Sequence, residues 1–211
     1  MLTVRNVSNN PFYNQAFEEY VYETFRDDDI FLLWQNSPAV VVGSYQNICR
    51  EVHVEALRQR GIPVVRRMSG GTIYTDMGGW QFTFIQHKEA GEIEFSQYIA
   101  PVIDALREMG VNAAFNGRND LTIDGKKFSG SAQYRLGDCI VHHGSLLFST
   151  DLGVLDQITT HRKNDCFQSR STQSAICTVT NIREHLAAPM TIEEFQTRLL
   201  DQIWCRPDVP V

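Results

Sequence analysis

The segment Arg66–Thr72, with the sequence RRMSGGT, combines two arginines, a serine and two adjacent glycines. Glycine lets a backbone approach a ligand closely and turn its N–H groups toward it, and neighbouring guanidinium and hydroxyl groups add charge-assisted donors. This combination suits a phosphate or a carboxylate. The alternative is a tight turn between two strands that carries two surface arginines, because paired glycines are common in turns. The segment is not a Walker A loop, since the pattern G-x-x-x-x-G-K-[ST] occurs nowhere in the chain.

A second polar segment, Asn116–Asp120, directly precedes a predicted strand. An asparagine next to an aspartate at the start of a strand, here Asn119 and Asp120, can hold a hydrated magnesium ion or a ribose hydroxyl. The same composition is typical of an ordinary turn in which asparagine and aspartate side chains bond to the backbone. The residues alone leave both interpretations open.

A third segment, Asp124–Ala132, places two lysines and a serine–glycine motif after a turn. Successive strand residues point to opposite sides, so at most one of Lys126 and Lys127 can enter a binding site. A lysine enclosed in a site needs an anion such as a carboxylate or a phosphate beside it, and the small residues from Ser129 to Ala132 leave room for that ligand. Taken alone the pattern is weak, because lysine pairs after a turn are usually solvated.

Two adjacent histidines, His142 and His143, precede Gly144 in a further predicted strand. Their side chains would lie on opposite sides of the strand, so they would not chelate one metal ion together. One of them could face a binding site as a donor or a base, but a lone histidine in a strand is more often a structural residue. We therefore assign His143 only a supporting role.

The composition argues against several classes of protein. The 211 residues include 19 Lys plus Arg against 25 Asp plus Glu, which gives a net charge of −6, so a basic nucleic-acid-binding surface is not expected. No apolar run approaches the roughly 20 residues of a membrane span, and the N-terminus has no signal-peptide pattern. Five widely spaced cysteines without a C-x-x-C pair argue against a disulfide framework and a zinc site. We expect a cytoplasmic protein without nucleic-acid or membrane partners.

Periodicity and cap signals predict the elements that position these segments. Asn10 followed by Pro11 starts a helix that runs to about residue 25, and a capping box at 191–194 starts another. A third helix closes at Gly110 and either begins near Ala100 or is kinked at Pro101. Strands are expected at 30–34, 39–42, 62–66, 80–84 (half-buried), 121–123, 126–128, 139–141 and 145–148, with a two-residue turn at 124–125.

Strands and helices are mixed without regular βαβ alternation, and no linker or internal repeat separates two domains. This arrangement predicts an α+β fold, with a large mixed β-sheet flanked by helices, over residues 1–211 as a single domain.

Taken together and in order, these segments resemble the lipoate-protein ligase A family, which is related in fold to biotin-protein ligases and class II aminoacyl-tRNA synthetases. The matching stretches are VVRRMSGGTIYTDMGG followed by WQFTFI, then GRNDLTIDGKKFSGSAQ, HHGSLL and TVTNI, between about Val40 and Ile182. Several ordered motifs over this length form a far stronger signal than any one of them. The resemblance implies a catalytic domain with the biotin/lipoate ligase-like fold.

The resemblance also implies a reaction in two steps. Lipoate and MgATP form lipoyl-AMP with release of pyrophosphate, and a specific lysine of a lipoyl-acceptor protein then attacks the acyl carbonyl to form an amide. The acceptor would be a dehydrogenase E2 lipoyl domain or the H protein of glycine cleavage. Fixed cations and amide donors would stabilise the charged phosphorus centre and the later oxyanion.

Residue roles follow from the same resemblance. Lys127 matches the family lysine that touches the acyl and phosphate oxygens, so it is the expected catalytic residue, and Asp120 is the candidate magnesium ligand. The residues expected to bind lipoyl-AMP or ATP are Arg66, Arg67, Ser69, Gly70, Gly71, Thr72, Tyr74, Asp76, Asn119, Asp120, Ser129, Gly130, Ser131, Ala132, His143 and Gly144.

The chain departs from the family pattern in several respects, and two of them bear on its function. Its loop has two consecutive glycines where the family usually carries three, so the loop is expected to be one residue shorter. Full-length ligases continue into an accessory C-terminal domain that assists adenylation, and this chain is expected to lack that domain. A separate accessory subunit is therefore a candidate partner.

Two other functions remain open. Cysteine-dependent octanoyl or lipoyl transferases share the fold but use a thiolate nucleophile and no ATP. Their cysteine shortly precedes the hairpin, where this chain has residues 113–116 without cysteine, so Cys166 is the nearest alternative. The third interpretation is a transfer-only protein or a non-catalytic one that binds a lipoyl domain.

Overall fold

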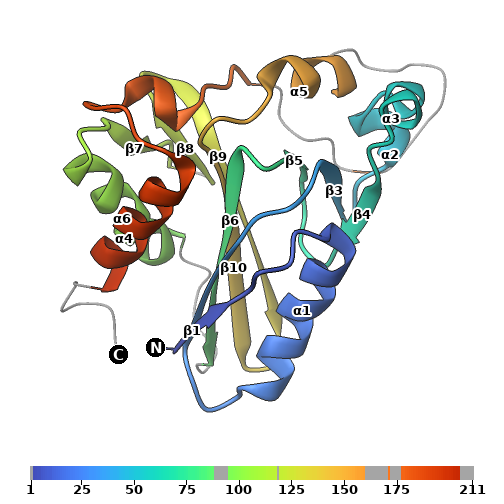
Figure 1. Cartoon of the computed structure of the whole chain (residues 1–211). Coiled ribbons are helices and arrows are strands. Elements are labelled where there is room, and N and C mark those ends of the chain that lie inside the picture. Colours follow the sequence, from blue (N-terminus) through green and yellow to red (C-terminus); the bar gives the residue numbers. More distant parts are fainter. Residues whose placement is uncertain (1, 88–94, 118, 160–170, 172–176, 205–211) are drawn as a thin grey trace.

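The computed structural model of this chain describes residues 2–87, 95–117, 119–159, 171 and 177–204. Its strands form two sheets, and its helices flank them (Figure 1). The predicted α+β class with a large mixed sheet is therefore confirmed. Within the described residues, no helix is long and apolar enough to cross a membrane.

The larger sheet has seven strands: β1 (Leu2–Arg5), β2 (Ile30–Trp34), β6 (Gly79–His87), β7 (Ala113–Phe115), β8 (Asp120–Ile123), β9 (Lys126–Leu136) and β10 (Cys139–Leu147). Their order is β1-β2-β6-β10-β9-β8-β7, with β1 and β2 parallel and the other neighbours antiparallel. The smaller sheet has the order β4-β3-β5 and consists of β3 (Ala39–Gly43), β4 (Val64–Arg67) and β5 (Thr72–Thr75). In it, β3 is parallel to β4 and antiparallel to β5.

The helices are α1 (Pro11–Thr24), α2 (Ile48–Glu51), α3 (Val54–Arg60), α4 (Ser96–Glu108), α5 (Leu152–Ile158) and α6 (Ile192–Trp204), with a short 3-10 helix at Ile182–His185. Helix α1 covers one face of the large sheet, and α4 and α6 cover the other (Figure 1). Helices α2, α3 and α5 pack beside the small sheet. The helices thus bury both faces of the central strands.

The predicted helix starts at Pro11 and Thr191 are confirmed, and their capping groups explain them. The Asn10 side chain accepts hydrogen bonds from the backbone N–H groups of Phe12 and Tyr13, at 2.9 and 3.3 Å. Thr191 and Glu194 form a reciprocal capping box, because each side chain accepts from the other residue's backbone N–H. Side chains of this kind each contribute about 1 kcal/mol to the helix that they cap.

Strand β6 corrects one prediction. The alternation from Trp80 to Phe84 predicts a strand with one solvated face, but every residue from Gly79 to Ile85 is buried. Phe82 and Phe84 pack in the core under α4 and α6. The polar residues Gln81 and Thr83 lie on the opposite face, which α1 covers, so they are buried too.

Three further boundaries differ from prediction. Residues 139–147 form one strand rather than two, because His142 and His143 pair with both β6 and β9. Helix α4 begins at Ser96, not near Ala100, and continues through Pro101. Strand β4 starts at Val64 rather than at residue 62, because its pairing with β3 begins at Val64.

The hairpin between β8 and β9 forms as predicted. Asp124 and Gly125 both have positive φ, at 50° and 77°. This is the two-residue turn whose twist matches that of antiparallel strands, and Asp-Gly is one of its preferred sequences. The turn brings Lys126 and Lys127 back alongside Thr122 and Ile123.

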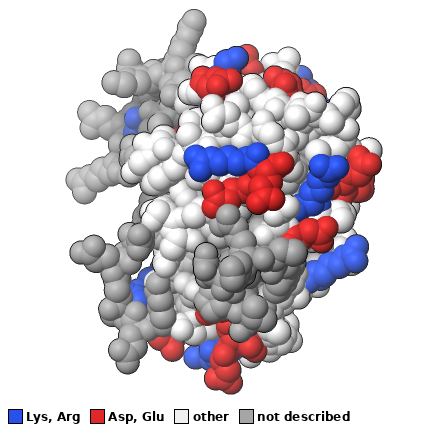
Figure 2. Space-filling model, turned by 90° about the vertical axis from the view of Figure 1, so that its left-hand side faces the viewer, with Lys and Arg blue, Asp and Glu red and all other residues white. Residues whose placement is uncertain are grey.

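The face that carries α4 and α6 has charges of both signs (Figure 2). Blue and red side chains lie next to one another on it. Arg107 and Asp104 of α4 form one such i,i+3 pair, 3.6 Å apart. Such a mixed surface gives no strong attraction for a polyanion.

Candidate functional site

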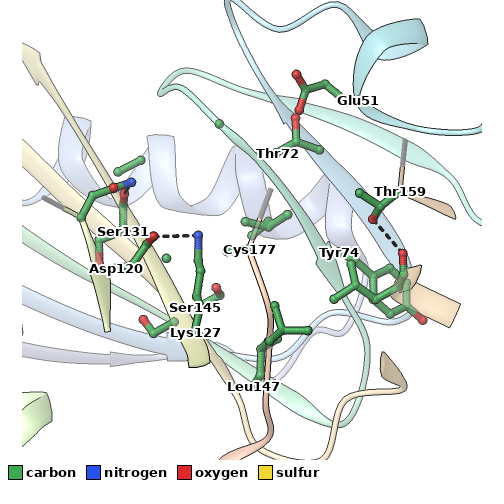
Figure 3. Close-up of a pocket in the computed structure, with 18 of the residues that line it drawn as sticks. Glu51, Thr72, Tyr74, Asp120, Lys127, Ser131, Ser145, Leu147, Thr159 and Cys177 are labelled. Atoms are coloured by element: carbon green, nitrogen blue, oxygen red, sulfur yellow. Dashed lines mark hydrogen bonds and ion pairs between the residues drawn. The ribbon is translucent and has the colours of Figure 1, made fainter. Parts of the chain in front are cut away.

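A cavity of about 1270 Å³ lies between the small sheet, α5 and the β8–β9 hairpin (Figure 3). Residues from all four predicted segments contribute to its wall, and the histidine segment does so through Ser145 and Leu147 rather than through its two histidines. The candidate residues that line it are Arg67, Gly70, Gly71, Thr72, Tyr74, Asn119, Asp120, Lys127, Ser129, Gly130, Ser131 and Ala132. The tertiary structure thus brings together two groups of candidates, one from the hairpin and one from the loop between β4 and β5.

We call the first group the lysine side: Asp120, Lys127 and Gly130 on β8 and β9. The Lys127 Nζ atom lies 2.7 Å from Asp120 Oδ1, and Figure 3 shows this ion pair at the cavity wall. A Cβ atom on Gly130 would lie only 2.9 Å from that Nζ, so the glycine makes room for the ammonium group. Lys126 is exposed, which confirms that only one of the two lysines enters the site.

The backbone of Lys127 is held by a segment distant in sequence. Its N–H donates to the Thr178 carbonyl oxygen at 2.8 Å, and its carbonyl oxygen accepts from the Thr180 N–H at 2.9 Å. These bonds form a parallel bridge between Lys127 and Val179. The TVTNI motif was noted in the sequence, but only the structure gives it this positioning role.

Asn116 fixes the start of β8. Its side-chain oxygen accepts from the backbone N–H groups of Asn119 and Asp120, at 3.2 and 3.1 Å. The Asn119 side chain in turn donates to the Ser131 carbonyl oxygen at 3.1 Å. The turn interpretation of this segment is therefore confirmed, and the same turn places Asn119 and Asp120 on the cavity wall.

We call the second group the loop side: Gly43, Arg67 and the loop residues 69–71. Gly71 has a φ of 78° and accepts from the Gly43 N–H at 2.7 Å. A Cβ atom on Gly43 would lie 2.6 Å from the Ser69 carbonyl oxygen, so β3 approaches this loop as closely as a glycine allows. Gly43 was not predicted, because no local pattern marks a contact with a loop 26 residues later.

Arg67 is half-buried on the loop side. Its Nη2 atom donates to the Gly70 carbonyl oxygen at 2.7 Å. Burial lowers the pKa of its guanidinium to about 10, and the nearby charge of Glu18 opposes this shift. The group therefore stays protonated near neutral pH and supplies a fixed positive charge beside the cavity.

Behind the loop lies a buried polar chain that joins three elements. The Ser69 hydroxyl is 2.5 Å from Nε2 of His143, and His143 Nδ1 is 3.2 Å from Oε1 of Glu18. Thr83 donates its hydroxyl hydrogen to the same Glu18 oxygen. Sequence reasoning missed Glu18, because α1 shows nothing but an amphipathic pattern and is separated from β10 by more than 100 residues.

Charge keeps Glu18 ionised despite its burial. Burial alone raises the pKa of this carboxyl group, but the charge and hydrogen bond of His143, the hydrogen bond of Thr83 and the charge of Arg67 together outweigh it. The net result is a lowered pKa. Glu18 is thus an anion within the core, paired with groups from β4, β6 and β10.

The two neighbouring histidines have opposite environments, as strand alternation predicts. His142 stacks on Tyr98, with ring centroids 4.8 Å apart, and lies among aromatic rings. Burial lowers its pKa to about 3, with a further contribution from His143. Neither of its ring nitrogens has a hydrogen-bond partner among the described residues.

Other candidates have structural contacts outside the cavity lining. Arg66 donates to the carbonyl oxygens of Gly43 and Gln46. Asp76 accepts from the backbone N–H groups of Gly78 and Asp151, which ties β5 to the start of α5. Gly144 packs against the Phe82 ring, where a Cβ atom would lie 2.5 Å from the ring. The predicted ligand contacts of Arg66, Asp76 and Gly144 remain predictions.

Three hydroxyl groups at the cavity wall are available for a ligand. The Oγ atoms of Ser129 and Ser131 and the Oγ1 atom of Thr72 are buried and have no hydrogen-bond partner among the described residues. A buried hydroxyl without a partner is costly, so these groups fit a polar ligand such as a phosphate or a ribose.

Cys177 lines the cavity near Lys127 (Figure 3). Burial raises the pKa of its thiol, the positive charge of Lys127 opposes this shift, and Asp120 adds to it. The cysteine named from the sequence, Cys166, lies outside the described residues. Within the described part of the chain, no group of three or more His, Cys, Asp or Glu side chains could hold a metal ion.

A family model and several known proteins match this chain. Residues 10–204 match the model of the lipoyl protein ligase A/B catalytic domain. The lipoate-protein ligase LplJ of Bacillus subtilis is 36% identical over 215 residues, which cover 99% of this chain and 64% of that protein. This chain therefore spans less than two thirds of the length of that relative.

Solved structures share the fold. A structure of Plasmodium falciparum LipL1 in complex with lipoate has a TM-score of 0.79 at 24% identity and covers 99% of this chain and 64% of that chain. A bi-partite lipoate protein ligase from Thermoplasma acidophilum, described with its E2 lipoyl domain, has a TM-score of 0.76 at 21% identity, over 95% of this chain and 80% of that one. The predicted ligase-like fold is thereby confirmed.

Proposed function

The chain belongs to the lipoyl protein ligase A/B catalytic domain family, and on this premise we propose that it is the catalytic domain of a lipoate-protein ligase. The proposed reaction activates lipoate with MgATP to lipoyl-AMP, releases pyrophosphate and transfers the lipoyl group to a lysine of an acceptor protein. The observation that carries the proposal is the Lys127 ammonium group, which is held in the wall of a large cavity that the glycine loop also lines.

Electrostatics supports the adenylation step. Attack of a carboxylate on the α-phosphate of ATP produces a phosphorus centre with increased negative charge, which fixed cations stabilise. Lys127 and Arg67 supply two positive charges, and both side chains line the cavity. The same groups would then hold lipoyl-AMP until an acceptor amine attacks its acyl carbonyl, expels AMP and forms the amide.

The chemistry of the wall also fits a nucleotide. The unpartnered hydroxyls of Thr72, Ser129 and Ser131 supply donors and acceptors for phosphate or ribose oxygens. Asp120 is the carboxylate on the lysine side that would hold Mg²⁺, since this ion needs only one or two carboxylates together with phosphates and water. When bound, Mg²⁺ would neutralise phosphate charge.

The proposed acceptor is a lipoyl domain of a dehydrogenase E2 subunit or the H protein of glycine cleavage. A fold relative from Thermoplasma acidophilum is described with its E2 lipoyl domain, which favours the first of these. The same relative is a bi-partite ligase, so the proposal includes an accessory subunit as a further partner.

Cys177 favours a second candidate function, the cysteine-dependent acyl transfer that uses no ATP. In that reaction its thiolate would attack an acyl thioester and release the carrier thiol, and the acceptor amine would then take the acyl group. Its position on the cavity wall beside Lys127 supports this role. The raised pKa of its thiol opposes it, because the thiol form is a poor nucleophile.

Lipoate-dependent exchange between ATP and pyrophosphate tests the proposal. The ligase requires exchange that depends on lipoate, and it requires transfer from synthetic lipoyl-AMP to an apo E2 lipoyl domain. Transfer from an acyl-carrier thioester without ATP, lost in Cys177→Ser or Cys166→Ser, would instead establish the second candidate. Binding of the apo domain with neither exchange nor transfer would leave a non-catalytic protein.

A further inference from the structure

Two large apolar side chains, Tyr45 and Met68, stand in solvent beside the glycine loop. Tyr45 is 74% exposed and Met68 is 51% exposed. Tyr45 also lines the cavity, so it lies at the opening of the cavity and not in its interior. Single exposed apolar residues are common on protein surfaces, so exposure alone gives them no function. We call these two residues the rim pair.

Hydrogen bonds fix the backbone that carries the rim pair. The Ser44 hydroxyl donates to the carbonyl oxygens of Arg67 and Met68, both at 2.9 Å. The Ser44 N–H donates to the Ser69 carbonyl oxygen at 2.9 Å, so the chain before Tyr45 is bonded to both sides of Met68. The two side chains therefore project from one backbone unit. A backbone that is already ordered loses little conformational entropy when it binds a partner.

Arg66 adds a positive charge to the same place. Its side chain is exposed, and its Nη1 atom donates to the carbonyl oxygens of Gly43 and Gln46, at 2.7 and 3.3 Å. These bonds hold the guanidinium group beside the backbone of Tyr45. Among the described residues, no carboxylate forms an ion pair with Arg66. The charge is therefore free to attract acidic groups on a partner.

The transfer step of the proposed reaction decides which partner reaches this rim. A lysine amine of a folded acceptor domain has to reach the acyl carbonyl, which the proposed function places beside Lys127. A cavity of about 1270 Å³ has the size of a small-molecule site, so a folded domain cannot enter it. Only the acceptor lysine enters, on its four-carbon stem. The surface that surrounds this lysine must then lie on the opening of the cavity.

We propose that the rim pair and Arg66 form the docking surface for the lipoyl-acceptor domain. The surface around the acceptor lysine would be apolar where it meets Tyr45 and Met68 and acidic where it meets Arg66. Tyrosine, methionine and arginine are the residue types that protein interfaces favour. The identity of the partner rests on the proposed ligase function. The rim pair holds the partner protein and touches no reacting atom.

Tyr45→Ala and Met68→Ala test the proposal. Their matched controls are Tyr20→Ala and Met77→Ala, since these two side chains are 58% and 44% exposed and lie outside the cavity lining. Transfer from synthetic lipoyl-AMP is measured at increasing concentrations of an apo E2 lipoyl domain. We expect the KM for the domain to rise about tenfold in each rim variant, as when a contact residue of an interface is truncated, and to stay unchanged in the controls. An unchanged KM in both rim variants would refute the proposal.

A small acceptor separates docking from damage to the cavity. Nα-acetyl-lysine amide carries the same amine but is too small to cover the rim. Met68 lies outside the cavity lining, so Met68→Ala should transfer the lipoyl group to this amine, and exchange ATP with pyrophosphate, at wild-type rates. A rate with the small amine that falls as far as the rate with the domain would contradict a docking role.

Binding without chemistry keeps this proposal separate from the proposed function. Calorimetry with the apo domain, in the absence of ATP and lipoate, should give a Kd that rises with salt and is about tenfold higher in Met68→Ala. A wild-type protein with neither exchange nor transfer would sink the ligase function, and the Kd values would still decide the docking surface. A wild-type dimer that Met68→Ala dissociates, seen by sedimentation, would show that a second copy occupies the rim and would overturn the proposal.

Discussion

The lysine side and the loop side of the cavity hold positive charge in different ways. Lys127 is partly solvated, with 26% of its side chain exposed, and its partner Asp120 is also close to solvent at 14%. Arg67 is half-buried and donates to the carbonyl oxygen of its own loop. One side therefore presents a charged side chain to a ligand, while the other presents a glycine backbone whose carbonyl group is bonded to a half-buried guanidinium.

The difference teaches how each side can respond to a ligand. The Lys127 ammonium group sits at the end of a flexible stem, and a partly exposed ion pair contributes at most about 1 kcal/mol, so it can exchange Asp120 for a phosphate. The loop cannot adjust in this way, because Gly43, Arg67 and His143 fix it from three directions. We expect the lysine side to supply chemistry and the loop side to supply shape.

The largest expected effect comes from removing the charge on the lysine side. Lys127→Ala should lower the rate of lipoate-dependent ATP–pyrophosphate exchange by about 100- to 1000-fold, the range for loss of one transition-state donor. Lys126→Ala is the matched control, because that neighbouring lysine is exposed and lies outside the cavity. Equal exchange rates in Lys127→Ala and Lys126→Ala would show that the lysine side supplies no specific catalytic charge.

Gly43→Ala tests whether the loop side is rigid. The new Cβ atom would lie 2.6 Å from the Ser69 carbonyl oxygen and 2.7 Å from the Gly70 carbonyl carbon, so backbone has to move. Overpacking of this kind costs about 1–3 kcal/mol, and each kcal/mol lowers the Tm of a domain this size by about 2–4 °C. Gly70→Ala, which has no atom within 4 Å of its Cβ, should leave the Tm unchanged in the same thermal scan.

Gly130→Ala makes the corresponding change on the lysine side. Its Cβ atom would lie 2.9 Å from Cε and Nζ of Lys127, and these side-chain atoms can swing away. We expect an unchanged Tm and an exchange rate about tenfold lower, because the ammonium group loses its position. A drop in Tm as large as that of Gly43→Ala would mean that both sides are equally rigid.

The smallest effect on stability at neutral pH is expected for His142→Phe, which removes the histidine of β10 that lies in apolar surroundings. The pKa of His142 is about 3 in the folded protein, below its ordinary value of 6.5, so the unfolded chain binds a proton between these values that the folded chain does not. Wild-type stability should therefore fall on acidification from pH 6 to pH 4, by up to about 1.4 kcal/mol per pH unit more than that of the variant. Urea unfolding at several pH values measures how the free energy of unfolding of each protein changes with pH. Equal slopes for the wild type and the variant would show that burial does not keep His142 uncharged.

Much of the fold and part of the site could be predicted from local patterns. The Asn10 cap, the capping box at Thr191 and the turn at Asp124–Gly125 each act within four residues, and all three formed as expected. Strand alternation also separated Lys126 from Lys127. The burial of β6 on both faces was missed, because which helices cover a sheet depends on the whole chain.

The sequence by itself determined the local geometry, because caps, turns and side-chain alternation depend on neighbours a few residues apart. The choice of Lys127 came from the ordered motifs that resemble the ligase family. Only the tertiary structure decided that Glu18 lies behind the glycine loop, that Gly43 supports it and that residues 178–180 hold the lysine backbone. These contacts join segments from different elements, and no short-range pattern encodes them. The physical reason is that burial and charge pairing are set by which surfaces meet when the sheets and helices pack.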